Sequence, residues 1–338
     1  MKKGIKRKIY NLNSELYKVT GIQRVLLDIH EALKTGLETK IVGTIPYRKV
    51  NRALDIDRKD YVRLRNPFVF RNSVVVIHER RLLPLMWVLT HIPGLNIRCV
   101  YVHHNELYGN KKLSRSLFPK NIVAISDAGI RNLTGYFGVA EEKITKIHNC
   151  VRETWHVKAC SRHFNPDDIK ILYPARINSV KQQVEIVKNL QGRLDSRIKI
   201  LFAGIGPMYD ELKSLCNDGG QFEALGFCSD IPELMCKCDF MMLFSQHEGL
   251  PISLIEAAQS GTPIICNDVG GNMEIVHDGE NGFVVNDWDS LLSTLNSLPL
   301  IKSADIARMS EAGRNIYLNN FKFDIFKRNY SQLIKSIK

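Results

Sequence analysis

The sequence has 338 residues, of which 44% are hydrophobic and 24% charged, a composition typical of globular proteins and a length typical of two domains. No apolar run approaches the ~20 residues that span a bilayer, and the basic start of the chain lacks the apolar core of a secretory signal. The net charge of +12 is uneven: residues 1–162 carry 30 Lys and Arg against 13 Asp and Glu, whereas residues 163–338 carry 17 against 22. We therefore expect the first half to face an anionic partner, with an ordinary solvated surface as the alternative.

The eight cysteines do not form a metal-binding pattern. There is no Cys-x-x-Cys pair, and the single cluster, Cys236 and Cys238, supplies too few ligands for a four-coordinate zinc site. We therefore expect free or buried thiols, no zinc and a cytoplasmic location, because a reducing compartment keeps thiols from pairing.

Short apolar runs alternate with helical patterns along the whole chain. The runs are rich in Val, Ile and Leu and do not alternate with polar residues, which is typical of parallel strands buried on both faces. We expect strands at 39–45, 73–79, 97–104, 121–127, 143–149, 169–175, 198–204, 222–227, 239–245, 262–268 and 282–287. We expect helices at 22–35, 180–191, 208–217, 231–237 and 251–260, and an amphipathic helix at the C-terminal end.

This alternation predicts an α/β fold with two doubly wound domains. The polar segment 153–168 has no clear period and is predicted to be the linker. The first domain is then 1–162 and the second 163–323, and the C-terminal helix 324–338 is expected to pack back on the first domain. Ligands of such sheets bind beyond the carboxyl ends of the strands, in the cleft between the domains.

Cations and glycines follow two strands of the second half. Arg176 and Lys181 follow strand 169–175, and Lys181 is expected to open a helix, where side-chain charge and free backbone N–H groups suit a diphosphate. Gly204 and Gly206 follow the next strand and permit close backbone approach to a ligand. The alternatives are surface cations and an ordinary turn, since the pair lacks the third glycine of a dinucleotide fingerprint.

Two acids flank the apolar run in "HEGLPISLIEAAQSG", residues 247–261. Glu248 is expected in the turn after a strand, and a helix is expected to begin near Pro251. The exposed N–H groups at the start of this helix would be those of Leu250, Ile252 and Ser253. A ligand could place phosphate at these groups and hydroxyls at Glu248 and Glu256. Alternatively, Glu248 complements the helix dipole and Glu256 packs against a neighbour.

These motifs resemble those of family 4 (GT4) retaining glycosyltransferases of the GT-B fold, of the type that assembles bacterial polysaccharides and glycolipids. The Glu-x7-Glu spacing in "EGLPISLIE" resembles the family signature, and "ARINSVK" resembles its Gly-Arg-Leu-x-x-x-Lys segment, with Ala175 in place of the glycine. The resemblance covers about 170–338 and includes "FAGIGP", "LGFCSDIPELM" and "SGTPIICNDVGGNMEIVHDGENGFVV". It continues more weakly through "VTGIQRVLLDIHEAL", "YVHHN", "VAISD" and "IHNCV" in the first half.

The resemblance implies two Rossmann-like domains that face each other across a cleft, with a nucleotide-sugar donor on the second domain. The catalytic residues would be Glu248 and His104, and the donor diphosphate would be bound by Arg176, Lys181 and Gly21. Contacts to nucleotide and sugar would come from Glu256, Gly206, Phe227, Gly249, Leu250, Pro251, Ile252 and Ser253. His104 is preferred to His103 because it precedes Asn105 as the family histidine often precedes Asp, and because His103 would point to the opposite face as a core histidine.

The resemblance also implies a reaction with retention of anomeric configuration, in which the leaving phosphate accepts the proton of the acceptor. Neither a protein nucleophile nor a metal is then needed, because Arg and Lys stabilise the leaving diphosphate; we expect no cofactor, and the Asp-x-Asp at 55–57 is interpreted as surface. The donor would be a UDP- or GDP-sugar and the acceptor a glycan or lipid-linked sugar, in capsule, O-antigen or related biosynthesis.

The segment 78–95 joins two arginines to an apolar run that contains Trp87. This pattern favours a peripheral position on the anionic inner face of the plasma membrane, with a core helix as the alternative. Two other functions remain open: another GT-B enzyme that acts on nucleotide sugars, such as an epimerase-like enzyme, or a catalytically silent basic binding partner. No nucleic-acid-binding module is visible.

Overall fold

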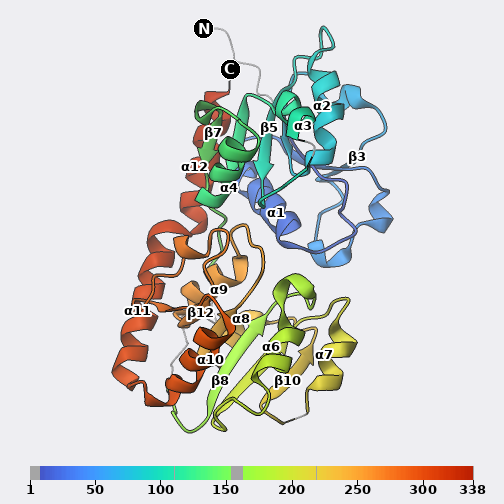
Figure 1. The fold of residues 1–338 in the computed structure, drawn as a ribbon. Coiled ribbons are helices and arrows are strands. Elements are labelled where there is room, and N and C mark those ends of the chain that lie inside the picture. The colour runs from blue at the N-terminus through green and yellow to red at the C-terminus, as the bar shows by residue number, and fades with distance from the viewer. Residues whose placement is uncertain (1–7, 110, 154–162, 218, 338) are drawn as a thin grey trace. The chain divides into compact units, whose positions relative to one another are not determined.

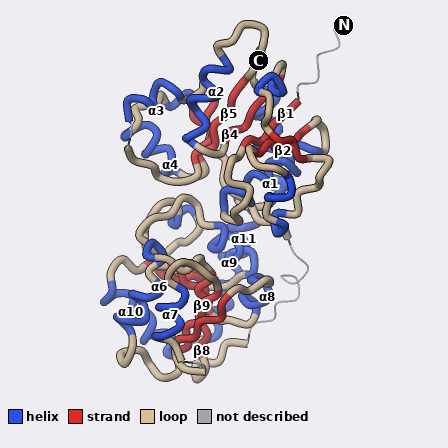
Figure 2. The backbone as a smooth tube through the Cα atoms, turned by 90° about the vertical axis from the view of Figure 1, so that its right-hand side faces the viewer, coloured by secondary structure: helices blue, strands red, loops and turns tan. Residues whose placement is uncertain are grey.

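Two parallel β-sheets organise the chain, and helices lie on both sides of each (Figure 1, Figure 2). The computed structural model describes residues 8–109, 111–153, 163–217 and 219–337. The chain divides into unit 1, Met1–Cys150 with Phe323–Lys338, and unit 2, Val151–Lys322. This division falls earlier than the expected boundary after residue 162, and most of the expected linker 153–168 lies outside the described residues.

The sheet of unit 1 has seven strands in the order β3-β2-β1-β4-β5-β6-β7. They are β1 (Lys8–Leu12), β2 (Thr39–Gly43), β3 (Tyr61–Arg63), β4 (Ser73–Ile77), β5 (Arg98–His103), β6 (Asn121–Ala124) and β7 (Ile144–Lys146). The helices are α1 (Gly21–Lys34), α2 (Leu83–Thr90), α3 (Lys111–Leu117), α4 (Asp127–Arg131) and α12 (Phe323–Ser336). Figure 2 shows α1 on one side of the strands and α3 and α4 on the other.

The sheet of unit 2 has six strands in the order β10-β9-β8-β11-β12-β13. They are β8 (Ile169–Pro174), β9 (Ile198–Ala203), β10 (Phe222–Gly226), β11 (Phe240–Leu243), β12 (Ile264–Cys266) and β13 (Gly282–Val284). The helices are α6 (Gln183–Leu190), α7 (Tyr209–Leu215), α8 (Ile231–Cys236), α9 (Ile252–Ser260), α10 (Trp288–Ser297) and α11 (Ser303–Asn320). Each sheet therefore has the doubly wound order. Successive strands are added toward one edge of the sheet and then, from one point on, toward the other edge.

The central strands are buried on both faces, which explains their unbroken apolar sequences. All five residues of β4 and all four residues of β11 are buried. Helices on both sides of a parallel sheet remove both faces from water, so alternation with polar residues would place polar groups in the core. The prediction of two doubly wound α/β units is therefore confirmed.

The last helix, α12, packs against α1 in unit 1. Its buried residues, Phe326, Tyr330, Leu333 and Ile334, recur at the spacing of one helical face. Burial of four such side chains contributes roughly 1.5–3 kcal/mol each relative to exposure. The C-terminal segment is therefore an integral part of the unit formed by the start of the chain.

Some elements were not expected from the sequence. Strand β1 carries Lys8 and Asn11 within five residues, and Asn11 is nevertheless buried, with its amide donating to the hydroxyl of Thr39 at 3.3 Å. Strand β3 has three residues at the edge of the sheet, too few for a periodic signal. The expectation of free thiols throughout is wrong at Cys236, which is disulfide-bonded.

Candidate active site

The strand order of unit 2 reverses between β8 and β11. Ligands of open α/β sheets bind beyond the carboxyl ends of the strands at such a switch point, because the two loops there lead away in opposite directions and leave a crevice. The loop after β8 carries Arg176 and Lys181, and the loop after β11 carries Glu248. The structure thus gathers three of the predicted residues at the switch point.

A short 3-10 turn, Ser179–Lys181, holds Lys181 in place. The side chain of Asn178 caps this turn by accepting a hydrogen bond of 3.0 Å from the N–H of Lys181. Gln182 follows with a left-handed φ of 56°, and α6 begins only at Gln183. The expectation that Lys181 opens the helix is therefore wrong, because the left-handed residue separates the turn from the helix.

Arg176 lies on the exposed part of the same loop. The side-chain amide of Gln183 donates to the carbonyl oxygen of Arg176 at 3.2 Å and accepts from the N–H of Asn178 at 3.4 Å. Gln183 is fully buried, so it braces the loop from the inside. The guanidinium of Arg176 consequently sits on a fixed backbone and remains accessible to an anion.

Lys181 and Glu248 form an ion pair through Nζ and Oε1, which joins the loops after β8 and β11. The side chain of Glu248 is 8% exposed and that of Lys181 is 22% exposed. Tyr173, at the end of β8, ties the same two loops together: its hydroxyl lies 2.6 Å from the carbonyl oxygen of Lys181 and accepts from the N–H of Phe244 at 3.1 Å. Burial raises the pKa of Tyr173, so the hydroxyl keeps the proton that it donates.

The turn that carries Glu248 is supported by the loop after β12. The side chain of Asn267 bonds both the N–H and the carbonyl of Ser245, at 3.0 Å and 2.7 Å. Gly270 has a φ of +59°, and a Cβ there would lie 2.2 Å from the carbonyl oxygen of Glu248. The N–H of Gly271 donates to the carbonyl of Gly249 at 2.8 Å. Only a glycine at position 270 permits this backbone contact.

Helix α9 begins just after the Glu248 turn. Pro251 is its N-cap, with φ of −66° and ψ of 123°, and no side chain of the described residues caps the helix. Pro251 was expected at about the first helical position, and the structure places it one residue earlier. The N–H groups of the first turn therefore point toward the switch point with the positive end of the helix dipole behind them.

The residues around this helix start are packed rather than loosely exposed. Leu250 is 3% exposed, and Gly249 and Pro251 are also buried. Ile252 and Ser253 are half-buried, and Glu256 on the second turn is 8% exposed. A ligand at this position would meet mostly backbone groups, which is a surface suited to phosphate and hydroxyl groups.

The glycines after β9 have a structural reason for their presence. A Cβ at Gly204 would lie 2.0 Å from the carbonyl oxygen of Ala175, and a Cβ at Gly206 would lie 2.0 Å from that of Ile177. The loops after β8 and β9 therefore pack backbone against backbone. A ligand contact at Gly206 stays a prediction, because the close approach that explains the glycine is that of the neighbouring loop.

Phe227 directly follows β10 and is 73% exposed. A large aromatic side chain gains little by facing water, and Phe227 lies at the same, carboxyl-end edge of the sheet as the switch point. An exposed ring at this edge is suited to stacking against a planar base.

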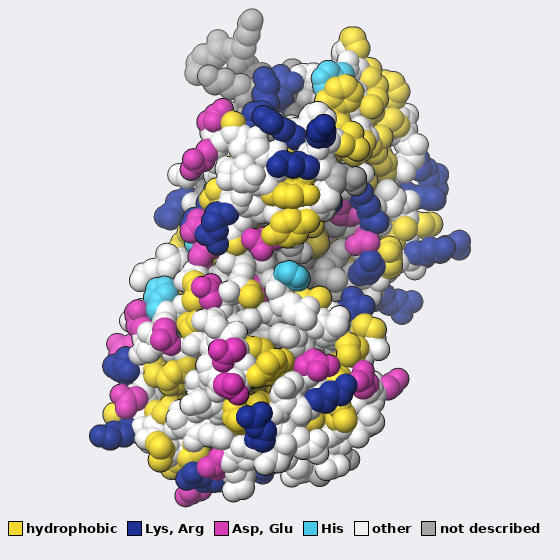
Figure 3. All heavy atoms as spheres, in the orientation of Figure 1, with side chains coloured by type: hydrophobic (Ala, Val, Ile, Leu, Met, Phe, Trp, Pro, Cys, Tyr) yellow, Lys and Arg dark blue, Asp and Glu magenta, His cyan; other side chains and the backbone are white. Residues whose placement is uncertain are grey.

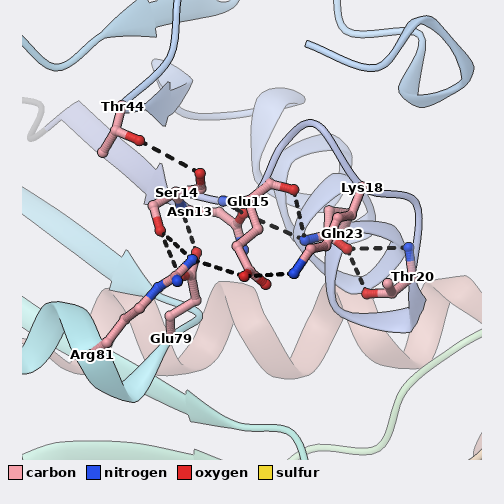
Figure 4. Close-up of polar contacts among 9 residues, drawn as sticks. All are labelled: Asn13, Ser14, Glu15, Lys18, Thr20, Gln23, Thr44, Glu79 and Arg81. Carbon is pink, nitrogen blue, oxygen red and sulfur yellow. Dashed lines mark hydrogen bonds and ion pairs between the residues drawn. The ribbon is translucent and has the colours of Figure 1, made fainter. Parts of the chain in front are cut away.

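Gly21 is the first residue of α1 in unit 1 and is exposed. The preceding residue, Thr20, forms a capping box with Gln23, in which the backbone N–H of Thr20 donates to the Gln23 side chain at 3.1 Å (Figure 4). This helix start is therefore capped by its own residues, unlike that of α9. Gly21 still provides a position without a side chain at the edge of the sheet.

A polar network fixes the loop between β1 and α1 (Figure 4). Glu79, which follows β4, accepts hydrogen bonds from the N–H and, at 2.7 Å, from the hydroxyl of Ser14. Arg81 pairs with Glu79 and, at 3.0 Å, with Glu15. Lys18 donates to Glu15 at 2.7 Å. Because β1 and β4 are the reversal point of this sheet, the network holds the edge from which Gly21 projects.

His104 follows β5 and is 7% exposed. Its Nε2 lies 3.1 Å from Nδ1 of His78, which follows β4. His103 faces other partners: its Nε2 lies 3.0 Å from the side-chain oxygen of Asn132, and its Nδ1 lies 3.4 Å from the hydroxyl of Tyr101. His103 is therefore a core histidine with partners, and His104 is the one that lies beside the reversal point of the sheet.

Sequence reasoning missed the residues that support these groups. Tyr173, Asn267, Gly270 and His78, which lie at or after the ends of strands, were not singled out, and neither was Gln183, the first residue of α6. Asn178 could have been found, because an Asn before a Ser-Val-Lys turn is a frequent capping residue. Tyr173, Asn267, Gly270 and His78 depend on contacts between segments far apart in the sequence. Gln183 bonds within its own loop, but nothing in the local sequence marks it as buried there.

Residues 160–315 match the family described as Glycosyl transferases group 1. EpsD of Bacillus subtilis (strain 168) is 32% identical over 162 residues, which cover 46% of this chain and 42% of that protein. The UDP-Gal:alpha-D-GlcNAc-diphosphoundecaprenol alpha-1,3-galactosyltransferase of Escherichia coli is 35% identical over 106 residues, 31% of this chain and 26% of that enzyme. The match thus spans less than half the length of either relative.

Solved structures extend the likeness to both units. The crystal structure of Anabaena HepE in complex with UDP has a TM-score of 0.81 and 15% sequence identity, and covers 98% of this chain and 100% of that chain. The complex of the same protein with UDP-glucose has a TM-score of 0.80 at 17% identity. At such identities the likeness shows the fold, which is the GT-B fold of two Rossmann-like units. Through residues 160–315, the chain is similar to the group 1 glycosyl transferases.

Proposed function

We propose that this chain is a family 4 retaining glycosyltransferase that moves a sugar from a UDP- or GDP-sugar to a glycan or lipid-linked acceptor. The observation that carries the proposal is the arrangement at the switch point of unit 2. There, the Lys181–Glu248 ion pair and the exposed Arg176 lie in the two loops that flank the reversal, and α9 begins directly after Glu248 without a side-chain cap among the described residues.

This arrangement has the charge pattern of a site for a nucleoside diphosphate bonded to a sugar. Arg176, Lys181 and the N–H groups of α9 would stabilise the diphosphate, since charge-assisted hydrogen bonds and a helix N-terminus both favour anions. Phe227 would stack on the base and Glu256 would accept from the ribose hydroxyls. Relatives support the choice of ligand: crystal structures of HepE contain UDP or UDP-glucose, and the Escherichia coli relative is named for UDP-Gal.

The proposed reaction breaks the bond between the anomeric carbon and the diphosphate and forms a bond from that carbon to an acceptor hydroxyl. The electron pair of the broken bond stays on the diphosphate, whose oxygen takes the acceptor proton. Arg176, Lys181 and the start of α9 would stabilise the negative charge that develops there. Glu248 would hold a hydroxyl of the donor sugar, and attack on the same face would retain the anomeric configuration. The fixed cations would serve where other transferases use a divalent metal.

Unit 1 would hold the acceptor and dock on an anionic membrane surface. Helix α2 buries Leu83, Met86 and Leu89 but leaves Trp87 44% and Val88 53% exposed. Figure 3 shows hydrophobic side chains gathered over the region of α2, with Lys and Arg side chains beside them. An apolar patch with an aromatic ring next to cations is suited to the headgroup region of a bilayer. No described helix has the length and apolar character needed to cross a membrane.

The proposal is tested by exposing the full chain to UDP-, GDP- and ADP-sugars and measuring thermal unfolding. A ligand at 100 times its dissociation constant stabilises the folded state by about 2.7 kcal/mol. We expect stabilisation by a UDP-sugar and the release of free UDP when an acceptor is added. Stabilisation without turnover on any acceptor would favour a silent binding partner, and conversion of the sugar without transfer would favour an epimerase-like enzyme.

A further inference from the structure

Two buried histidines meet at the carboxyl edge of the unit 1 sheet. His78 follows β4 and His104 follows β5, and these strands are paired, with Ile77 opposite Tyr101. Nδ1 of His78 lies 3.1 Å from Nε2 of His104, and the rings stack with centroids 5.3 Å apart and planes 23° apart. The geometry is that of a direct hydrogen bond between two imidazoles.

Both rings are neutral in this environment. His78 is 2% and His104 is 7% exposed. Burial, and then the neighbouring His104, hold the pKa of His78 well below its usual range, and burial lowers the pKa of His104 to about 3. A hydrogen bond between two neutral imidazoles needs one protonated and one bare nitrogen. The tautomer of one ring therefore sets the tautomer of the other.

The other nitrogen of His78, Nε2, is buried and has no hydrogen-bond partner among the described residues. An unpaired buried polar atom destabilises a fold, and a phenylalanine would fill similar space without it. Such an atom persists in functional sites, where a group is kept for a purpose other than stability. Its presence indicates that the Nδ1 bond to His104 is the reason for a histidine at this position.

The backbone around His78 is held firmly enough to support such a role. The N–H of His78 donates to the carbonyl of Leu12 at 3.3 Å. Next in the chain, Glu79 accepts from Ser14, and Arg80 donates to the carbonyl of Gly109 at 3.1 Å. Residues 78–80 thus bond the loops after both β1 and β5, which fixes the His78 ring relative to His104.

We propose that His78 is a positioning residue that fixes the orientation and tautomer of His104. Nδ1–H of His78 donates to Nε2 of His104, because the reverse arrangement would leave an unpaired buried N–H at Nε2 of His78, and orphaned N–H groups are the rarer kind. His104 then carries its own proton on Nδ1, an atom that no described protein group bonds. His104 is thereby a hydrogen-bond donor toward a ligand oxygen and not a base. That this ligand is the donor sugar rests on the proposed function.

The tautomer can be read without any sugar. Long-range proton–nitrogen NMR correlations on the full chain, with labelled histidine, distinguish a protonated from a bare ring nitrogen. We expect a bare Nε2 and a protonated Nδ1 for His104 in the unsubstituted chain. His78→Phe keeps an aromatic ring but removes the donor, so His104 should become a mixture of tautomers. His78→Asn places an amide N–H near the former Nδ1 and should restore the single tautomer.

Activity gives a second measurement, because a purely structural role of His78 would not produce the following pattern of kcat, stability and UDP affinity. With UDP-glucose as the probe, His78→Phe should lower kcat by about tenfold to a hundredfold, as small misplacements of reacting groups do. Its unfolding temperature should be unchanged or higher, and its UDP affinity unchanged, while His78→Asn should recover most of kcat. In a His104→Ala background, His78→Phe should have no further effect.

Two results would overturn the proposal: a protonated Nε2 on His104 in the unsubstituted chain, or an unaltered His104 spectrum in His78→Phe. Should UDP-glucose not be turned over, the proposed function loses support for this donor, while the NMR measurement still decides the role of His78. The two failures are therefore distinguishable.

Discussion

Lys181 and Glu248 form an ion pair across the switch point of unit 2, although the family resemblance implies that one binds the diphosphate and the other the sugar. In the described structure, each of these side chains is therefore the charged partner of the other. A bound diphosphate would attract Lys181 and release an oxygen of Glu248 for a sugar hydroxyl. The pair would keep both side chains ordered before the donor arrives, at a lower cost in side-chain entropy on binding.

Removal of either cation should weaken nucleotide binding. We expect Arg176→Ala and Lys181→Ala each to raise the Kd of UDP about tenfold to a hundredfold, because a hydrogen bond to a charged group contributes about 1.5–3 kcal/mol. Isothermal titration calorimetry would measure this. Lys188→Ala, which removes a surface lysine from α6 in the same unit, is the matched control and should leave the Kd unchanged. Equal Kd values for UDP in the unsubstituted chain and in all three variants would show that the diphosphate does not bind at this site.

Substitutions of Glu248 and Glu256 should have different effects on UDP binding and on turnover. Glu248→Gln should lower turnover of the donor while UDP binds nearly as before, because UDP lacks the sugar hydroxyl that Glu248 would hold. Glu256→Ala should weaken the binding of UDP itself, because it would remove the acceptor for the ribose hydroxyls. Calorimetry with UDP together with rates of UDP release would show this, and the same loss of UDP affinity in both variants would show that the roles are divided wrongly.

Gly270 offers a test of how the Glu248 turn is held. Gly270→Ala should destabilise the fold and impair donor binding, since its Cβ would lie 2.2 Å from the carbonyl oxygen of Glu248. Gly279 is the matched control: its φ is +69°, but no described atom lies within 4 Å of a Cβ built there. Gly279→Ala should cost only the left-handed backbone strain of about 1–2 kcal/mol and spare UDP binding. Chemical denaturation would compare the stability of the two variants, and calorimetry their affinity for UDP. Equal effects would show that the contact between residue 270 and Glu248 does not hold the turn.

Activity should survive excess EDTA. The leaving diphosphate would be stabilised by Arg176, Lys181 and the start of α9, so a divalent ion would have no necessary part. Rates of UDP release with and without EDTA would test this expectation. Complete loss of activity that manganese or magnesium restores would contradict the proposed mechanism.

Membrane association should depend on salt and on α2. The full chain should float with anionic liposomes at low ionic strength and less at high salt, because nearby cations contribute roughly 1 kcal/mol each and are screened within a Debye length. Trp87→Glu with Val88→Glu should reduce flotation. Leu300→Glu, at a 79% exposed position in unit 2, should not. A chain that stays unbound at low salt would refute docking on anionic lipid.

The sequence could predict the site where a polar residue directly follows an apolar strand. Arg176 stands out because it lies just after β8, and Glu248 because it lies between the apolar strand β11 and the apolar run that becomes α9. Local sequence carries no information on partners chosen by sheet register, such as Tyr173 with Phe244. The same holds for His78, which looks like the end of an apolar run until β4 and β5 are paired. Strand β1 was missed because Lys8 and Asn11 interrupt its apolar pattern, although tertiary packing buries Asn11.

The return of α12 to α1 has a consequence for synthesis. Unit 2 is one continuous segment, Val151–Lys322, whereas unit 1 needs Phe323–Lys338 as well as the first part of the chain. On the ribosome, unit 2 therefore has all of its residues before unit 1 does. Until α12 emerges, the apolar surface of unit 1 that α12 covers stays open to water, to chaperones and to aggregation partners. A truncation before Phe323 should thus expose apolar surface in the part of the protein that was made first.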